Sequence, residues 1–247
     1  MRTLYLAWQA PDPVRAWFPI GQLDAAPEKS DYVFRYTHGA LEAKKQVGFE
    51  PLVAFPDFKK RYESSELFPL FSNRVLSPAR KDFADYLRWL GLDAQHSDPI
   101  AVLSASGGER QTDSLEVFPK IEKAEDNSFR CRFFVHGLRH VSPSARARAE
   151  NLKAGELLQV ALELNNPAAG AAVQLQSRDD YQMIGWAPRY LVGDLLKAMA
   201  EHSDLSAKVI QANIDGAPLN QRVLVELTGK LPMDFKPMAS REFQPLV

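Results

Sequence analysis

The sequence predicts an α+β protein in two parts, a small β-rich module with a helix and then a β-rich domain or small barrel with two helices. Three observations predict this fold class. Short apolar runs recur along the chain with turn residues between them, which is typical of strands in antiparallel sheets. Two Ser-Pro pairs each precede a stretch of helical character. The 247 residues, 45% of them hydrophobic, are enough to bury a core in each part.

The first part begins with three expected strands, over residues 3–8, 16–23 and 32–36, and a short helix over 39–47. Residues 51–69 contain three prolines and are expected to be irregular. Ser77 is a plausible N-cap and Pro78 suits the first helical position, so a helix is expected from there to Leu90. Further strands are expected over 100–103 and 115–118.

A charged stretch without large apolar residues, 123–128, separates the two parts. The strands expected beyond it are 129–135, 157–164, 171–176, 183–186, 209–215 and 223–231, and the helices are 142–152 and 190–200. The final residues show no periodicity. We therefore expect a module over 1–98, a connecting segment over 99–127, a second domain over 128–232 and a C-terminal tail over 233–247.

Composition limits the classes of function. The formal net charge is -1, so any nucleic-acid binding requires a local cationic patch. The single cysteine, Cys131, lies in an apolar run and is expected to be buried and inert, with no disulfide possible within the chain. No apolar run approaches the ~18 residues of a membrane span. The low cysteine content favours a cytoplasmic location.

Motifs of the common enzyme classes are absent from the sequence. There is no Walker-type phosphate loop, no His-Glu-x-x-His and no Gly-x-Ser-x-Gly. Only His136 and His140 have a spacing that suits metal ligands, and a zinc site would need two more. We therefore expect a non-enzymatic protein with no catalytic residue, no metal and no cofactor.

A cationic segment covers residues 128–153. Its charged residues are one acid, Glu150, and six cations, Arg130, Arg132, Arg139, Arg146, Arg148 and Lys153. His140 adds a seventh group that can carry positive charge. Such a cluster suits phosphate binding, because each neutralised phosphate releases counterions. The alternative interpretation is a solvated helix face.

Two further corners contain groups suited to a ligand. Asn165 and Asn166 precede Pro167 in a turn, and their amides can donate and accept hydrogen bonds at once. Trp186 and Arg189 lie where a strand ends and a helix begins. An aromatic ring can stack on an unpaired base, and arginine adds charge. The simpler interpretations are a turn for the asparagines and core packing for Trp186.

These segments together resemble the HIRAN domain. The resemblance covers about 128–232 and rests on the order of three motifs, Gly137-Leu138-Arg139-His140, Asn165-Asn166-Pro167 and Ile184-Gly185-Trp186-Ala187-Pro188-Arg189. It implies an OB-like barrel that binds single-stranded DNA or DNA ends. The nucleic-acid-binding residues that it implies are Arg139, His140, Asn165, Asn166, Trp186 and Arg189.

One departure from the HIRAN pattern concerns end recognition. After Asn-Pro the family has a Tyr-Asp pair, where this sequence has Ala168 and Ala169. Alanine side chains can neither stack on a base nor hydrogen-bond a terminal hydroxyl. The substitution therefore implies weakened specificity for a free 3′ end.

Residues 2–92 resemble the N-terminal subdomain of HipA-type toxin kinases. The matching segments are Ile20-Gly21-Gln22-Leu23, residues 32–36, Pro51-Leu52 and residues 67–76. No kinase catalytic motif follows, so the resemblance implies a docking module and no kinase activity. Phe68 and Phe71 are the partner contacts that it implies, and core packing is the alternative for both.

Two main hypotheses of function follow, and a small enzyme without a recognised motif is a third. The first is a DNA-binding protein whose ligand is single-stranded DNA or DNA ends. The second is an antitoxin-like interaction module that docks on a HipA-type kinase or another protein through its N-terminal half. Salt dependence separates the first two, because phosphate contacts weaken steeply with salt. Neither hypothesis involves a membrane.

Overall fold

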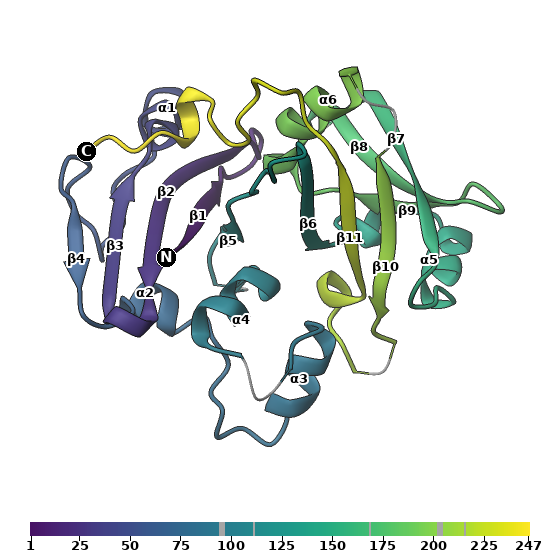
Figure 1. Ribbon diagram of the computed structural model, residues 1–247, viewed down its shortest axis with the longest axis horizontal. Coiled ribbons are helices and arrows are strands. Elements are labelled where there is room, and N and C mark those ends of the chain that lie inside the picture. Colours follow the sequence, from purple (N-terminus) through teal and green to yellow (C-terminus); the bar gives the residue numbers. More distant parts are fainter. Residues whose placement is uncertain (94–96, 111, 168, 202–204, 215) are drawn as a thin grey trace. The chain divides into compact units, whose positions relative to one another are not determined.

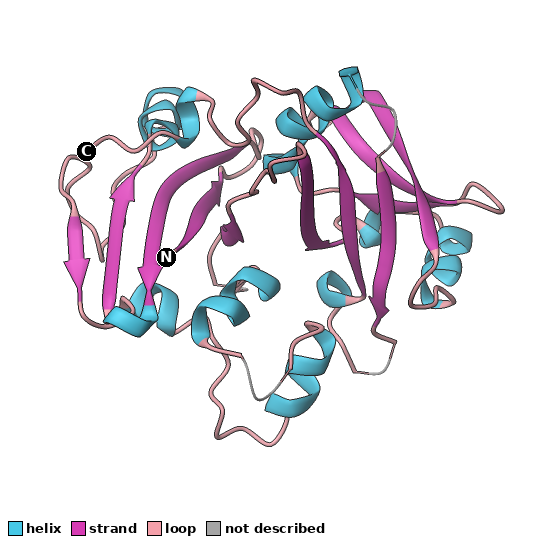
Figure 2. Cartoon of the chain, in the orientation of Figure 1, coloured by secondary structure: helices cyan, strands magenta, loops and turns pink. Residues whose placement is uncertain are grey.

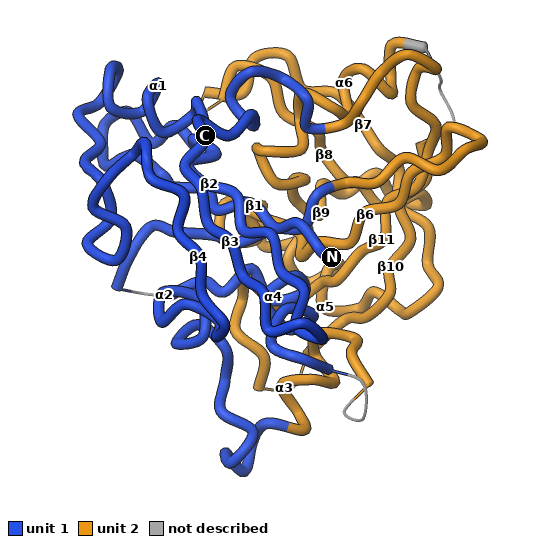
Figure 3. Tube along the Cα trace, turned by 60° about the vertical axis from the view of Figure 1, so that its left-hand side comes forward, with its two compact units in different colours: residues 1–83, 95–120, 238–247 blue, residues 84–94, 121–237 orange. Residues whose placement is uncertain are grey.

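A computed structural model describes residues 1–93, 97–110, 112–167, 169–201, 205–214 and 216–247. The chain divides into two compact units, shown in separate colours in Figure 3. Unit 1 comprises residues 1–83, 95–120 and 238–247, and unit 2 comprises residues 84–94 and 121–237. Each unit contains one antiparallel sheet together with helices (Figure 2), so the predicted mixture of α and β structure is confirmed.

Unit 1 is built on a five-stranded sheet of order β4-β3-β2-β1-β5 (Figure 1). Its strands are β1 (Arg2–Gln9), β2 (Trp17–Ala26), β3 (Asp31–Tyr36), β4 (Tyr62–Ser64) and β5 (Leu115–Pro119). Its helices are α1 (His38–Val47), α2 (Pro69–Ser72) and α4 (Pro99–Ser106), with short 3-10 turns η1 (Pro27–Lys29) and η5 (Arg241–Phe243). The first three predicted strands and the helix after them agree with β1, β2, β3 and α1 within a few residues.

One face of this sheet forms the core of unit 1. Strand pairing sets Leu4 opposite Leu23 and Leu23 opposite Phe34, so large apolar side chains align across three strands. Phe34 also stacks on Phe55 with the ring centroids 4.0 Å apart. Phe71 lies within the same cluster and is fully buried. The aromatic residues of the proline-rich stretch therefore cover the sheet instead of forming a separate surface.

Residues 238–247 are part of unit 1, although they follow unit 2 in the chain. Main-chain bonds join the amide of His38 to the carbonyl of Gln244, and the amide of Leu246 to the carbonyl of Tyr36, each at 2.9 Å. The ring of Phe243 packs edge-on against Tyr5, with the centroids 5.0 Å apart. The segment is held by contacts with distant parts of unit 1 and not by a long helix or strand of its own. Its sequence therefore shows no periodicity.

Three elements differ from the sequence predictions: β4, α4 and α3 (Phe83–Trp89). Strand β4 lies within residues 51–69, which the sequence predicts to be irregular, and pairs with β3. Residues 100–103 are not a strand but part of helix α4, because the carboxylate of Asp98 caps the amides of Ile100 and Ala101 and Pro99 occupies the first turn. The helix expected from Ser77 begins only at Phe83. The Ser77 hydroxyl accepts a bond from the amide of Ala79, 3.3 Å away, in a local turn.

Unit 2 contains a six-stranded sheet of order β6-β11-β10-β7-β8-β9. Its strands are β6 (Ser128–Phe134), β7 (Leu157–Asn166), β8 (Gly170–Ser177), β9 (Met183–Trp186), β10 (Ser206–Ala212) and β11 (Val223–Lys230). Its helices are α3 (Phe83–Trp89, whose first residue falls in unit 1), α5 (Pro143–Glu150) and α6 (Val192–Glu201). Its 3-10 turns are η2 (Leu138–His140), η3 (Arg189–Leu191) and η4 (Leu219–Gln221).

The two edges of this sheet approach each other at one point. An isolated antiparallel bridge joins His136, just beyond β6, to Trp186 at the end of β9. Among the described residues this single bridge is the only pairing between the two edge strands. The sheet is therefore not seen as a closed barrel. The OB-like barrel remains a prediction. None of the helices in the described ranges has the length and apolar character needed to cross a lipid bilayer.

Cys131 lies on β6 and faces the core of unit 2, as the apolar run around it predicts. Burial raises the pKa of its thiol to about 12, with smaller contributions from the negative charges of Asp194 and Glu226. Only the thiolate is reactive, and the thiol form is favoured throughout the physiological pH range.

We expect Cys131 to react very slowly with a thiol reagent such as dithionitrobenzoate in the folded protein at pH 8. In urea it should react at the rate of an ordinary exposed cysteine, because its pKa then returns to about 8.5. The measurement is the absorbance of the released thionitrobenzoate over time. Rapid reaction without urea would contradict the burial of this side chain.

Candidate functional site

The candidate site of unit 2 is formed where the residues after β6 meet the end of β9. The amide of His136 donates to the carbonyl of Trp186 at 2.9 Å, and the reverse bond is 3.0 Å long. The next residue, Gly137, has a positive φ of 79°. A Cβ atom there would lie 2.3 Å from Cε3 of Trp186. Only glycine therefore allows the indole ring to lie directly against this turn.

The edge of the same indole ring is fixed by Glu163 of β7. Nε1 of Trp186 donates to Oε2 of Glu163 at 2.7 Å, and Nδ2 of Asn166 donates to the same oxygen at 3.0 Å. The bond from Trp186, helped by bonds from Gln174 and Asn166, lowers the pKa of the Glu163 carboxyl, although partial burial opposes the shift. Glu163 is thus an ionised acceptor at neutral pH.

These contacts bring together two residues of the predicted site, Trp186 and Asn166, through a third that sequence reasoning missed. Alternation along the predicted strand, which sets Glu163 on the face opposite its apolar neighbours Leu162 and Leu164, is the signal that could have found it. Asn165 is exposed at the end of β7. Ala168, the first residue of the departure from the HIRAN pattern, lies outside the described residues.

Arg189 lies in the turn η3 and is half-buried. Burial, assisted by the positive charge of Arg189, lowers the pKa of His136 to about 4. The imidazole of His136 is therefore neutral at pH 7 and contributes no positive charge to the site. Its part in the site is the main-chain bridge to Trp186.

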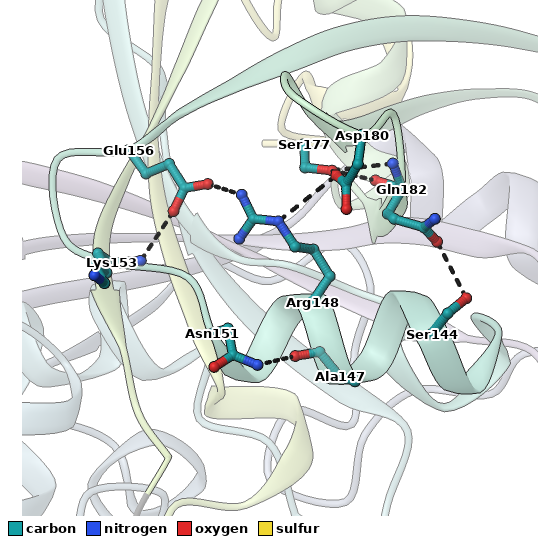
Figure 4. Close-up of polar contacts among 9 residues, drawn as sticks. All are labelled: Ser144, Ala147, Arg148, Asn151, Lys153, Glu156, Ser177, Asp180 and Gln182. Atoms are coloured by element: carbon teal, nitrogen blue, oxygen red, sulfur yellow. Dashed lines mark hydrogen bonds and ion pairs between the residues drawn. The ribbon is translucent and has the colours of Figure 1, made fainter.

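Half of the cations predicted between residues 128 and 153 are ion-paired. Arg132 lies 2.8 Å from a carboxylate oxygen of Glu226, and Arg130 lies 3.8 Å from the same oxygen. Arg148 pairs with Glu156 and, at 3.6 Å, with Asp180 (Figure 4). Acids neutralise these three arginines, so they add little to a phosphate-binding patch.

The Arg148 ion pairs belong to a polar network that fastens α5 to the sheet (Figure 4). Asp180 accepts a bond from the hydroxyl of Ser177 at the end of β8. At the start of α5, Ser144 contacts Gln182 at 3.3 Å. The helix is therefore connected to the β8–β9 turn at two points.

A second group of cations has neutral partners. Nε of Arg139 donates to Nε2 of His140 at 2.9 Å, so that imidazole nitrogen is an acceptor. Arg146 donates to the main-chain carbonyl of Arg139 at 3.3 Å. Arg139, His140 and Arg146 are all exposed. Because neutral acceptors orient these side chains without cancelling their charge, the guanidinium groups remain able to bind an anion.

A small surface depression adjoins this group. Arg146 of α5 and Arg222, which follows η4, both line it. Nε of Arg222 donates to the carbonyl of Ala217 at 3.0 Å, again a neutral partner. Turns η2 and η4 pack together, which places Leu138 in the lining as well. Sequence reasoning missed Arg222 because it lies 76 residues beyond Arg146, outside the cationic segment.

The predicted partner contacts in unit 1 need a correction. Phe71 is fully buried and packs 5.9 Å from Phe34, measured between ring centroids. It stabilises the core and cannot contact a partner in this fold. Phe68 is partly buried and packs edge-on against Phe55 at 5.2 Å. The core-packing interpretation of these aromatics is the one that agrees with the structure.

Comparisons with known proteins yield little. No family model matches this chain, and no curated protein matches it. A solved structure from Lactobacillus plantarum, described as a structural genomics target, is 18% identical and has a TM-score of 0.34. The match covers 41% of this chain and 92% of that one. At this level of similarity the match supports no argument about the fold or the site.

Proposed function

We propose that this chain is a non-enzymatic DNA-binding protein, in which unit 2 binds single-stranded DNA or DNA ends on an OB-like barrel of the HIRAN kind. The observation that carries the proposal is the charge of Arg139 and Arg146, which His140 accompanies as a neutral hydrogen-bond acceptor. These exposed side chains are oriented by one another and by a main-chain carbonyl, without an acidic partner among their described contacts. Phosphate groups are the ligand that suits such an arrangement.

Trp186 supports the same proposal. Its indole is half-buried, covered by Gly137 on one side and fixed at its edge by Glu163. A ring held in this way is suited to stack on an unpaired base. The carboxylate of Glu163 disfavours phosphate beside the ring, so the DNA backbone is expected to follow the cations of η2 and α5 while a base approaches Trp186.

The end specificity of this site is expected to be weak. Ala169 lies at the β7–β8 turn, where the HIRAN pattern has an acidic residue. Its side chain has no group to bond a terminal hydroxyl. The antitoxin-like alternative loses Phe71 as a surface contact, so we treat it as an outcome of the test and not as a second proposal.

The first test is fluorescence anisotropy with short single-stranded DNA, with the 3′ end free or blocked, at two salt concentrations. We expect affinity that falls with salt and is nearly the same for both ends. No binding at low salt would overturn the proposal. In that case the search for a protein partner of unit 1 becomes the next experiment.

A pair of double variants locates the binding surface. Arg139→Ala with Arg146→Ala removes two cations with neutral partners, and we expect affinity to fall about tenfold or more at low salt. The slope of log affinity against log salt should decrease by about 0.7 for each lost phosphate contact.

The matched control is Arg130→Ala with Arg132→Ala. It changes the net charge of the chain by the same amount, but it removes arginines that already pair with Glu226. We expect a loss of affinity of no more than about threefold. Equal losses in the two double variants would place the DNA elsewhere and contradict the assigned surface.

A further inference from the structure

The lining of the depression between α5 and η4 is mostly apolar, and two arginines belong to it. Leu138, Ala149 and Ala212 contribute apolar surface to it. Arg146 and Arg222 line it from separate segments of unit 2. A mostly apolar site whose lining includes two arginines fits a ligand that has one anionic group attached to a less polar body.

Both arginines are oriented before any ligand arrives. Each donates to a main-chain carbonyl, that of Arg139 for Arg146 and that of Ala217 for Arg222. The η4 side of the depression is further fixed by buried Asn213, whose amide bonds the carbonyls of Trp89 and Gln221 at 2.9 and 2.8 Å. Preorganised guanidinium groups lose little side-chain entropy when they bind an anion.

We propose that this depression binds a phosphomonoester at the end of a DNA strand. The inference rests on the proposed function and names the kind of end that the site prefers. A terminal phosphomonoester has a charge of about -1.5 to -2 at pH 7 and three free oxygens, whereas a diester within the strand has a single charge. Two arginines in fixed positions favour the group with more charge and more acceptors.

Glu150 also lines the depression, one turn of helix beyond Arg146. Its carboxylate reduces the attraction of the site for anions. The site therefore suits a single phosphate group rather than several neighbouring ones. Removing the charge of Glu150 should increase the affinity of the depression for a phosphate group, whereas removing an arginine should decrease it.

The test is competition with an internally labelled single strand. Unlabelled oligothymidylates of one length carry a 5′-phosphate, a 3′-phosphate or hydroxyls at both ends. We expect one of the two phosphorylated strands to compete about tenfold better than the strand with two hydroxyls, as for a charge-assisted pair with arginine. Which strand competes better identifies the end that the site takes.

Three variants assign the preference to this depression. Arg222→Gln should abolish the preference for a terminal phosphate but leave the affinity for the hydroxyl strand within about twofold. Arg178→Gln, which removes an exposed arginine of unit 2 outside the depression, should keep the preference. Glu150→Gln leaves both arginines in place and should increase the preference. Circular dichroism checks that each variant is folded.

The outcomes separate this inference from the proposed function. If the protein binds all three strands equally, the inference is overturned and the proposed function stands. If it binds none of them, the proposed function itself fails, and the inference with it. If Arg222→Gln does not fold, Glu150→Gln decides the matter, because an unchanged preference in that variant overturns the inference.

Discussion

The substitution Gly39→Ala is expected to destabilise unit 1 by about 3 kcal/mol or more. Gly39 is the second residue of α1, and a Cβ atom there would lie 2.1 Å from the carbonyl oxygen of Pro19 and 3.0 Å from that of Glu242. Both are main-chain atoms, in β2 and in the C-terminal segment, so neither can move away as a flexible side chain can. The overlap has to be relieved by shifting α1 from the sheet.

The matched control is Gly193→Ala. Gly193 is likewise the second residue of a helix, α6, and no described atom lies within 4 Å of the position of its Cβ. There the substitution should be neutral or stabilising by up to about 1 kcal/mol, through helix propensity alone.

The measurement for this pair is urea unfolding followed by circular dichroism, with hydrogen exchange of β2 amides to identify the unit that loosens. Two units can unfold separately, so the midpoint of the first transition is the quantity to compare. Equal midpoints in the two variants would show that α1 does not approach β2 as closely as described.

The substitution Gly137→Ala is expected to displace the indole of Trp186. The new Cβ would lie 2.3 Å from Cε3 of the ring and 2.6 Å from Cζ3. The ring cannot yield without weakening the 2.7 Å bond between Nε1 and Glu163. We expect a cost of about 1–2 kcal/mol for the left-handed backbone and a further 1–3 kcal/mol for the overlap.

Gly155→Ala separates the two contributions. Gly155 also has a positive φ, of 90°, but no described atom lies within 4 Å of the position of its Cβ. The Gly155→Ala variant should therefore lose only the free energy that the left-handed backbone costs an alanine. In a proton–nitrogen correlation spectrum, the Trp186 Nε1 resonance, assigned with Trp186→Phe, should shift in the Gly137 variant and stay in place in the Gly155 variant. A resonance that stays in place in both would rule out the packing of the ring on this turn.

Local signals in the sequence predicted most of the elements. β9 and the cap of α5 were predicted at the residues where they occur, because alternation, Ser142 and Pro143 act within a few positions. Helix α4 was missed because its short apolar run fits either a strand or a buried helix. The Asp98-Pro99 pair was the signal that decides between them.

The site was predicted only in part, because a sequence shows short motifs but not the contacts between distant segments. Trp186, Arg139 and His140 stand out by residue type in short motifs. Glu163 and Arg222 are ordinary residues of regular elements, and only the pairing of distant strands and turns brings them to the site. The sequence also cannot show which cations meet an acid, as Arg132 meets Glu226 across two strands.

The packing of residues 238–247 against unit 1 affects the order in which the units fold during translation. Tyr5 of unit 1 lacks its packing partner Phe243 until that residue has been synthesised. Residues 121–237 of unit 2 are synthesised before Phe243. The nascent chain can therefore complete unit 2 first and holds an unfinished unit 1 through most of its synthesis. A fusion or truncation at residues 238–247 would therefore affect the folding of unit 1, whose first residues are synthesised before those of unit 2.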